Sequence, residues 1–389
     1  MIKSDLKNQL GGRESLRFSL RLCVFAGERK VFRKDAKAQS KRLSFFDIAC
    51  RFIATTCFLV SLVVVSAAAQ IVKLTAQELK QRVDVEIDGK PFTSYRWDAS
   101  IKRPVLLPLM SVGGEFITRG FPIETRAGET VGHPHQVGVS FSYGDVNGFD
   151  FWNNSTFRKA DERIRMGTIV HRKIVKIKSG KTRGELVTEA DWLTPNGEKI
   201  LTETTRYIFA ASGTTRRIDR ETTLTANGNA VVFGDNKEGL FAIHLNRRLQ
   251  QDNQIPAKIT DAQGNITEAR SNENLSGEYL SSEGLTGERI WGTLGKWVSV
   301  SGKIGAGETI TVAVFDSPKN LNYPSSMMVR PYGLLALNPF GRKAFDPKTE
   351  ARKFILEPQK SVKFRHRLLI LAEKAALETL EKEYRNYIK

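Results

Sequence analysis

Two histidines in the segment Gly132-His133-Pro134-His135-Gln136 form the densest group of side chains that could carry out chemistry. In an extended segment residues two apart point to the same side, so we expect His133 and His135 to share a face. Such a pair could bind a metal ion, transfer protons near neutral pH, bind a substrate or form structural hydrogen bonds. A metal site needs a third ligand, and the other three histidines are far apart in the sequence. We therefore interpret the pair as proton-transfer candidates, assign no metal ligand and leave the cofactor unknown.

Aromatic and polar side chains are mixed closely in the next segment, residues 143–152. It holds four aromatic residues, two glycines, two aspartates and one asparagine. Aromatic rings stack on the apolar faces of sugar rings, while carboxylates and amides bind the hydroxyl groups. A tight turn over a buried aromatic cluster would use the same residue types. On the first interpretation Asn147, Asp150 and Trp152 bind a substrate.

Charged residues occupy two further turns. Lys237 and Glu238 are adjacent in a glycine-bounded turn, and burial could make either of them an acid or a base. Asp316 begins an irregular segment, and Arg330 and Tyr332 stand near its end. There Arg330 could bind a carboxylate or hydroxyl groups, or brace the loop. Exposed turns have the same composition, so both groups also have a purely structural interpretation.

The first 69 residues are predicted to be a basic extension, from a misplaced start codon or a cytoplasmic tail, followed by a removable export signal. Residues 53–65 are almost entirely apolar, Arg51 precedes them, and three alanines at 67–69 supply the small residues that a signal peptidase needs. This stretch is shorter than the roughly 20 residues that a membrane-spanning helix requires. We expect cleavage before Gln70, a single domain over residues 70–389 with no membrane span, and a periplasmic or secreted location. An uncleaved anchor is the alternative.

Removing this leader changes the composition of the chain. The leader holds all three cysteines, 13 of the 60 Lys and Arg residues and 5 of the 42 Asp and Glu residues, so the remainder carries about +10 instead of +18. Disulfides, cysteine-ligated metals and thiol catalysis are thereby excluded from residues 70–389. The moderate charge indicates solubility or attraction to acidic glycans, not nucleic-acid binding. Nucleotide-binding and serine-hydrolase motifs are also missing, which favours carbohydrate chemistry.

Period-two alternation of apolar and polar residues dominates residues 70–389 and predicts β-strands. Glycine and asparagine turns separate the strands, and one polar face on each indicates antiparallel pairing. We expect a loop over residues 246–288, an irregular segment over 316–345 that packs against the domain, and one amphipathic helix over 373–387. The fold class is therefore all-β, a large antiparallel β-sandwich with a C-terminal helix. The expected strands are 83–87, 92–97, 168–178, 185–193, 199–210, 216–226, 231–233, 297–300, 309–315 and 362–371.

Five segments together resemble one bacterial family: HPHQVGVSFSYGDVNGFDFW, VVFGDNKEGLFAI, WGTLGKWVSVSG, VAVFDSPKNLNYP and RPYGLLALNPFG. The family carries the label "methane oxygenase PmoA" and is also treated as a domain of unknown function; the resemblance runs from about Arg103 to the C-terminus. The methane monooxygenase subunit of that name is an integral membrane protein, whereas this chain has no spanning run after Ala69. The resemblance therefore implies an exported β-sandwich, similar to galactose-mutarotase-like sandwiches, in bacteria that degrade glycans.

Several residues depart from the pattern of that family. Its Asp-His-Pro-His-His motif is here Gly132 to Gln136, and its Asp-His-Pro becomes Asp316-Ser317-Pro318. A tryptophan–histidine pair ahead of Arg330 becomes Met327-Met328. If the family's histidines act together, the losses imply an altered substrate or a binding-only role. Retained are Asp145, Asn147, Asp150, Trp152, Lys237, Glu238, Asp316, Asn320, Arg330 and Asn338.

The combined interpretation is an exported carbohydrate-active protein that acts on a sugar or oxidised sugar by lyase, hydrolase or epimerase chemistry. A non-catalytic glycan-binding module and a metal-dependent oxygenase are the alternatives. The partner is a small molecule or glycan, not nucleic acid, and the oligomeric state stays open. The catalytic candidates are His133, His135, Lys237 and Glu238, and the substrate-binding candidates are Asn147, Asp150, Trp152, Asp316, Arg330 and Tyr332.

Overall fold

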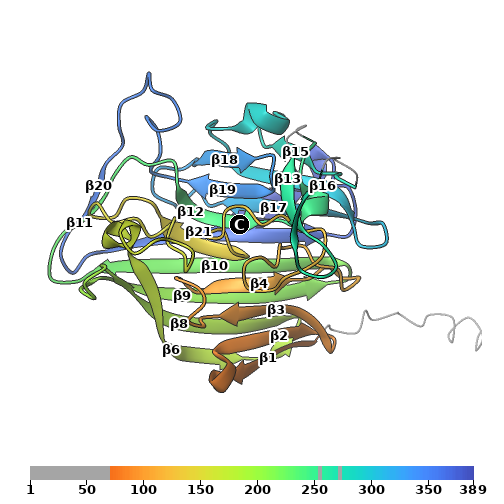
Figure 1. Ribbon diagram of the computed structural model, residues 1–389, viewed down its shortest axis with the longest axis horizontal. Helices are drawn as coiled ribbons and strands as arrows, with labels where there is room; N and C mark the ends of the chain where they lie inside the picture. Colours follow the sequence, from red (N-terminus) through yellow and green to blue (C-terminus); the bar gives the residue numbers. More distant parts are fainter. Residues whose placement is uncertain (1–70, 253–255, 270–273) are drawn as a thin grey trace, which may run out of the picture. The chain divides into compact units, whose positions relative to one another are not determined.

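A computed structural model describes residues 71–252, 256–269 and 274–389 of the chain, and these residues form one compact unit (Figure 1). The expected leader, with its cleavage site and its three cysteines, lies outside the described residues. Within the described residues, no helix has the length and apolar character needed to cross a membrane.

Two large sheets make up this unit, and all the strand pairs within each are antiparallel. The first sheet has nine strands, and β18 and β19, from the later part of the chain, join it beside β12. In spatial order its strands are β18 (Ser326–Arg330), β19 (Leu334–Asn338), β12 (Gly239–His244), β5 (Val139–Tyr143), β4 (Val105–Leu109), β3 (Lys90–Arg96), β2 (Arg82–Ile87), β1 (Ile71–Gln77) and β7 (Gly180–Lys181).

The second sheet has eight strands, four of them long and consecutive in the sequence apart from β7. Its strands are β15 (Glu278–Ser281), β16 (Trp297–Ile304), β17 (Glu308–Asp316), β21 (Ser361–Leu371), β10 (Thr215–Ala226), β9 (Lys199–Ser212), β8 (Arg183–Leu193) and β6 (Thr168–Lys178). Two short hairpin-like sheets pair β11 (Val231–Phe233) with β20 (Phe354–Leu356), and β13 (Ala257–Thr260) with β14 (Ile266–Ala269). The helices are η1 (Glu78–Lys80), η2 (Glu162–Arg165), η3 (Arg247–Leu249), η4 (Gly287–Ile290) and α2 (Leu377–Ile388).

The core lies between the two sheets. In β10 the residues alternate strictly between half-buried and buried, because successive side chains of a strand point to opposite faces of the sheet. The buried members pack in one continuous cluster with the inward residues of the other sheet, such as Val85, Phe141 and Phe241. Apolar side chains buried in this way supply the main stabilisation of the sandwich.

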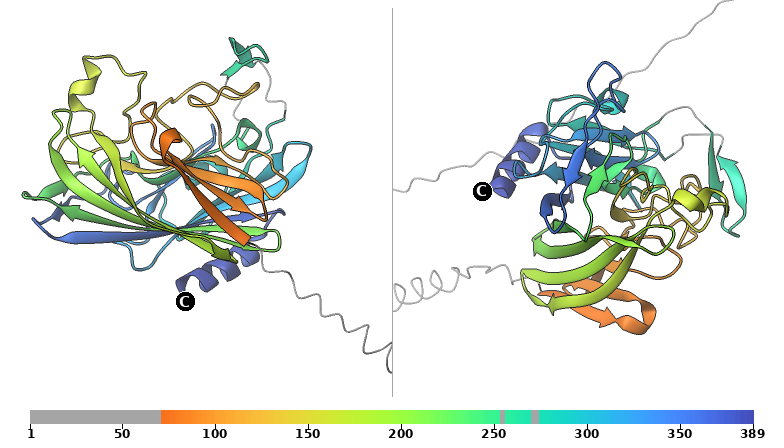
Figure 2. Two further views of the ribbon diagram at one scale, coloured as in Figure 1. Left: turned by 90° about the horizontal axis from the view of Figure 1, so that it is seen from below. Right: turned by 90° about the vertical axis from the view of Figure 1, so that its left-hand side faces the viewer.

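The outer faces of the two sheets are covered differently. Helix α2 packs Leu380 and Tyr384 against Trp297, Phe315 and Leu369 on the outer face of the eight-stranded sheet. Long loops cover the outer face of the nine-stranded sheet, and Figure 2 shows these loops and α2 on opposite sides of the sandwich. A small apolar cluster that contains Trp152 and Ala242 lies under these loops.

The structure confirms the antiparallel β-sandwich with a C-terminal helix, and most predicted strands lie within two residues of the observed ones. Three expectations were wrong. Residues 316–345 contain β18 and β19, which are buried at nearly every position and so show no alternation. Residues 246–288 contain β13, β14 and β15 in addition to loops. The helix begins at Leu377, four residues later than expected, after Ala376 with extended backbone.

Candidate functional site

The segment around the two histidines is a turn, not an extended strand. Pro134 and His135 form a turn, and His133 has a left-handed backbone with φ of 52°. The expectation that His133 and His135 point the same way is therefore wrong. His133 is exposed whereas His135 is only 9% exposed, and their rings lie edge to face with centroids 5.9 Å apart.

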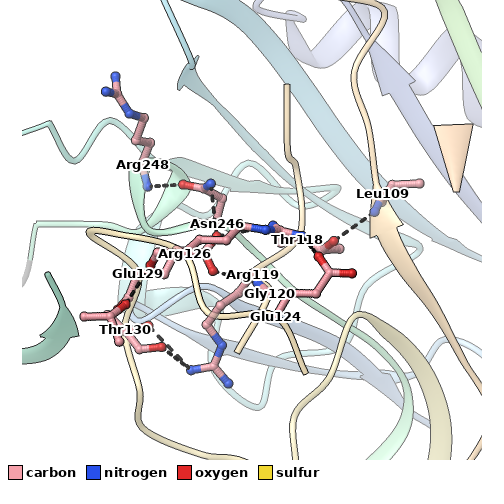
Figure 3. A network of polar contacts seen from close by, with 11 residues as sticks. Leu109, Thr118, Arg119, Gly120, Glu124, Arg126, Glu129, Thr130, Asn246 and Arg248 are labelled. Atoms are coloured by element: carbon pink, nitrogen blue, oxygen red, sulfur yellow. Dashed lines mark hydrogen bonds and ion pairs between the residues drawn. The ribbon is translucent and has the colours of Figure 1, made fainter. Parts of the chain in front are cut away.

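The Arg119 side chain holds this turn in place. Its guanidinium donates hydrogen bonds to the backbone carbonyls of Thr130, Gly132, His133 and Gln136, at 3.1 Å for Thr130 and 2.9 Å for His133. Figure 3 shows the contact with Thr130 and the surrounding polar network, in which the Glu129 carboxylate accepts from the Gly120 amide at 2.7 Å. Burial lowers the pKa of Arg119 to about 10, so the side chain remains a cation at neutral pH.

His133 and Tyr332 form a stacked pair. Their ring centroids are 4.3 Å apart and the ring planes differ by 11°. Tyr332 follows β18 and packs against the apolar cluster on the outer face of the nine-stranded sheet. Partial burial, together with the Arg119 and Arg330 cations, lowers the pKa of His133, so its ring is neutral at pH 7. A neutral imidazole can accept a proton.

A cavity of about 330 Å³ opens beside the stacked pair. Its walls are largely apolar, with a few polar groups, which is the usual composition of a small-molecule site. None of the described lining residues is acidic. The lining residues are Arg119, Thr130, Val131, Gly132, His133, His244, Arg247, Gln250, Pro256, Ala257, Lys258, Leu275, Pro331 and Tyr332.

His244 is the most deeply buried histidine of this cavity, with 1% of its surface exposed. It ends β12, where it lies on the outer face because its neighbours Ile243 and Leu245 point into the core. Neither ring nitrogen makes a well-aligned hydrogen bond within the described part of the chain, although the Tyr332 backbone lies near enough to act on the ring. Burial, followed by the Arg119 cation, keeps the pKa of His244 well below its usual value. A buried polar ring without a partner is costly, so a ligand that bonds to it would bind favourably.

His135 lies away from this cavity. It lines a much smaller pocket beside Arg103, with room of only about 10 Å³. The Arg103 guanidinium donates to the backbone carbonyl of His135, and burial with the nearby Arg103 charge lowers the pKa of His135 to about 3. His135 therefore has neither the access nor the proton affinity of His133.

Glu238 precedes β12 and Arg330 ends β18, and β19 lies between these two strands in the sheet. The Glu238 side chain is 19% exposed, and its carboxylate lies 3.8 Å from the Lys237 ammonium. Burial raises the pKa of Glu238, the Lys237 and Arg330 cations oppose this, and the Asp150 charge adds to it. Arg330 ends β18, and its guanidinium stacks 3.5 Å above the ring of Trp291. The Arg330 charge acts on His133, Tyr332 and Glu238, and the Glu238 charge acts on Tyr332, so we treat these four residues as one electrostatic cluster.

Three candidates come from the 143–152 segment, and each has a mainly structural contact. Asp150 accepts hydrogen bonds from the amides of Trp152 and Asn153, both at 2.8 Å, and from the Asn153 side chain. Trp152 is 1% exposed, and its indole nitrogen has no partner among the described residues. Asn147 lies in an exposed turn and accepts from the Val232 amide at 2.7 Å. Trp152 belongs to the apolar cluster that Tyr332 packs against, and the Asp150 charge acts on Glu238.

The surroundings of Asp316 differ from those of the other candidates. It ends β17, has no exposed surface and accepts hydrogen bonds from the Asn320 side chain at 2.7 Å and the Ser325 amide at 2.9 Å. Its neighbour across the strands is His366, at 3.8 Å. The structure thus stacks His133 on Tyr332, links this pair to Arg330 and Glu238 by charge, and leaves Asp316 in the interior.

Two residues of the site, Arg119 and His244, were not among the sequence candidates. Arg119 acts through the turn at Gly132–Gln136, 13 residues away, and no sequence pattern indicates that contact. His244 had a detectable signal, because a histidine inside the apolar run GLFAIHL interrupts a buried strand. In the part of the chain that the structure describes, no three His, Cys, Asp or Glu side chains are grouped closely enough to hold a metal ion.

These features define a β-sandwich protein with a ligand-sized cavity and a polar cluster on the outer face of one sheet. A family model matches residues 82–385, and the chain belongs to this family of unknown function (DUF6807). No curated protein matches the chain.

Solved structures that resemble the chain do so at low similarity. The galactosidase domain of an alpha-galactosidase–sucrose kinase (AgaSK) is 10% identical with a TM-score of 0.40, over 77% of this chain and 42% of that one. A putative kojibiose phosphorylase from the human microbiome is 10% identical with a TM-score of 0.33, over 82% and 35%. A galactose mutarotase-like protein from Clostridium acetobutylicum is 9% identical with a TM-score of 0.34, over 77% and 98%. This chain spans less than half the length of the first two.

Proposed function

We propose that this protein is an exported, carbohydrate-active protein that acts on a sugar or an oxidised sugar at the cluster of His133, Glu238, Arg330 and Tyr332. The observation that carries the proposal is the Tyr332 ring, which stacks on His133 at the cavity and lies within electrostatic range of Arg330 and Glu238. Stacked rings beside convergent polar groups suit a sugar, because its rings have apolar faces and hydroxyl edges.

Proton transfer is the chemistry that these residues support best. Burial raises the pKa of Glu238 and lowers that of His133, so the proton affinities of the two groups move toward each other and either group could exchange a proton with a substrate. The Arg330 guanidinium forms no ion pair with a described residue, which leaves it free to stabilise an oxyanion. Removal of a C–H proton next to a carbonyl group gives an enolate that Arg330 would stabilise. Return of the proton to carbon completes an epimerase cycle, and departure of a leaving group completes a lyase cycle.

Hydrolysis by two carboxylates is less well supported. That mechanism needs a second carboxyl group that can act on the scissile bond or on water. Asp150 is the acidic group nearest to Glu238 in electrostatic terms, but both of its oxygens already accept hydrogen bonds from Trp152 and Asn153. We therefore favour lyase or epimerase chemistry over hydrolysis.

Two parts of the proposal rest on the sequence. Export rests on the apolar stretch and the three alanines within residues 53–69. The connection to the PmoA-labelled family, and to galactose-mutarotase-like sandwiches, rests on the five motif segments, of which RPYGLLALNPFG spans β19. Secretion of a reporter fused to residues 1–75, with processing at Gln70, would support export.

Turnover of the Glu238→Gln and His133→Ala variants tests the site. Against a panel of neutral and oxidised glycan fragments, each variant is expected to lose about a hundredfold in kcat with little change in Tm, since general acid–base groups contribute on that scale. Glu357→Gln, at an exposed position, is the matched control and should keep full activity. Unchanged kcat in both site variants would contradict the proposal.

A binding-only role is the second candidate, and the burial of His135 favours it. Only one of the two histidines in the turn reaches the cavity, so the proton-transfer set is small. Under this alternative the wild-type protein binds glycan fragments without forming product, and Tyr332→Leu weakens that binding about fivefold because the stacking surface is lost.

A further inference from the structure

We propose that the cavity beside His133 and Tyr332 is a subsite for the carboxylate of an acidic sugar, such as a uronate residue. This inference rests on the proposed function, and it names the class of substrate that the cluster would act on. Three independent features of the cavity point to an anion: its charge, its unpaired buried donors and its apolar wall.

The charge of the cavity is one-sided. Its described lining contains the cations Arg119, Arg247 and Lys258 and no acidic side chain. The nearest buried carboxylate, Glu129, is bonded to the Gly120 amide and to Arg126 at 3.5 Å, and it makes no direct contact with the Arg119 guanidinium. Like charges gathered in a concave, partly dry site attract a ligand of opposite charge.

The Arg119 cation is not neutralised by its hydrogen bonds. All its described acceptors are neutral oxygens, of the carbonyls at Thr130, Gly132, His133 and Gln136 and of the Thr130 hydroxyl, and its Nε atom has no partner. The Lys258 ammonium forms no ion pair or hydrogen bond with any residue that the structure describes, and the side chain is exposed at the rim. A carboxylate in the cavity would be attracted by the positive charges of both Arg119 and Lys258.

His244 supplies the second feature. Its imidazole lines the cavity and is 1% exposed, and neither ring nitrogen makes a well-aligned hydrogen bond to a described residue, although the Tyr332 backbone lies near enough to act on the ring. A neutral imidazole offers one N–H donor, and a hydrogen bond from it to a charged acceptor is stronger than one to a hydroxyl group. The ring is thus a ready donor for a carboxylate oxygen.

The wall and the size of the cavity fit a sugar acid. Val131, Pro256, Leu275 and Pro331 line the wall with apolar surface, which excludes water and strengthens the interaction between the bound anion and the cations. A volume of about 330 Å³ lies at the small end of the range for ligand pockets, roughly 300–1,000 Å³. Because Arg119 and Lys258 would offset its charge, a carboxylate held here would also acidify the adjacent C–H bond for the neighbouring base, which fits the proton-transfer chemistry.

Matched pairs of saccharides test the inference. The probes are methyl glucuronide against methyl glucoside, and methyl galacturonide against methyl galactoside, with binding followed by NMR titration of the wild-type domain. We expect about tenfold tighter binding of the acidic member of at least one pair, since a hydrogen-bonded charge contributes on that scale. Lys258→Gln should remove most of this preference and leave Tm unchanged, and Lys258→Glu should reverse it. Lys303→Gln, at an exposed lysine of β16, is the control for net charge and should keep the preference.

The outcomes separate the inference from the proposed function. If neutral members bind as tightly as acidic ones and Tyr332→Leu weakens both, the carboxylate subsite is wrong and the sugar site stands. Tighter binding of glucose 6-phosphate than of the uronides also overturns the carboxylate assignment. Resonances of the cavity that respond to none of the saccharides contradict the proposed function itself.

Discussion

Asp316 and Glu238 are two carboxylates that burial perturbs in the same direction but that lie in different surroundings. Burial raises the pKa of both, to about 6 for Asp316. Asp316 is fully enclosed and accepts hydrogen bonds from Asn320 and Ser325, whereas the nearest cation to Glu238 is the exposed Lys237 at 3.8 Å. The comparison shows that a perturbed pKa does not by itself mark a site of chemistry. Access, and an exposed ion-pair partner in place of enclosed hydrogen-bond donors, distinguish Glu238.

Replacing Asp316 with alanine should give the largest effect, a loss of about 3 kcal/mol in the free energy of unfolding, because buried donors lose a charged acceptor. Urea unfolding at pH 7 measures this, with Glu357→Ala at an exposed position as the control. Glu238→Gln, by comparison, should change stability little. If Asp316→Ala kept its stability but lost saccharide binding, Asp316 would belong to the site, as the sequence pattern indicated.

His366 gives the second largest effect, and it depends on pH. Burial, followed by the Arg220 charge, lowers its pKa to about 3 from 6.5. Because the unfolded state takes up the proton first, this contribution to stability is present above pH 6.5 and is lost as the pH falls toward 3. From pH 7 to pH 5 the loss amounts to about 2 kcal/mol.

His366→Phe should remove this loss, since the ring stacked on Phe241, with centroids 4.8 Å apart, is kept without the titrating group. The comparison is the difference in unfolding free energy between pH 7 and pH 5, for variant and wild type. Asp316 has the opposite sign, because its raised pKa makes it lose stability as the pH rises through about 6, but it is present in both proteins. An equal pH dependence in the two proteins would show that His366 takes up its proton without unfolding.

The fold could be predicted from the sequence where the strands have one solvent-exposed face. The long strands β8, β9 and β10 alternate between buried and partly exposed positions, and the limits of these strands and of β6 were predicted within two residues. Strands β18 and β19 have buried side chains on both faces, since loops cover the outer one, and they left no period in the sequence.

The site could be predicted only in part. Four site residues lie in turns or at strand ends, where charged and aromatic residues can be recognised in the sequence as candidates: His133, Glu238, Arg330 and Tyr332. The contacts of Arg119 with the carbonyls of a distant turn depend on tertiary structure, so no local pattern indicates them. Asp316 could not be placed from the sequence either, because the residues around it are as typical of a ligand-binding loop as of the buried end of a strand.

The smallest effect should come from Ser142, and it separates the two outer faces of the sandwich. Ser142 lies on β5 beside the site strand β12, is 0% exposed and has no hydrogen-bond partner for its hydroxyl within the described residues. Ser142→Ala should therefore raise the unfolding free energy by up to about 1 kcal/mol, since it removes a buried polar group that lacks a partner.

Ser301 is the matched control on the opposite sheet. It is also buried, but its hydroxyl is paired with that of Thr311 at 2.8 Å, so Ser301→Ala should lower the unfolding free energy by about 1 kcal/mol. Opposite signs in the two variants, measured by urea unfolding, would mean that the loop-covered face keeps polar groups at the expense of stability. If Ser142→Ala also weakened saccharide binding, that hydroxyl would serve the ligand. Destabilisation by both variants would instead mean that Ser142 is paired in solution, and the contrast between the two faces would then rest on His244 and Trp152 alone.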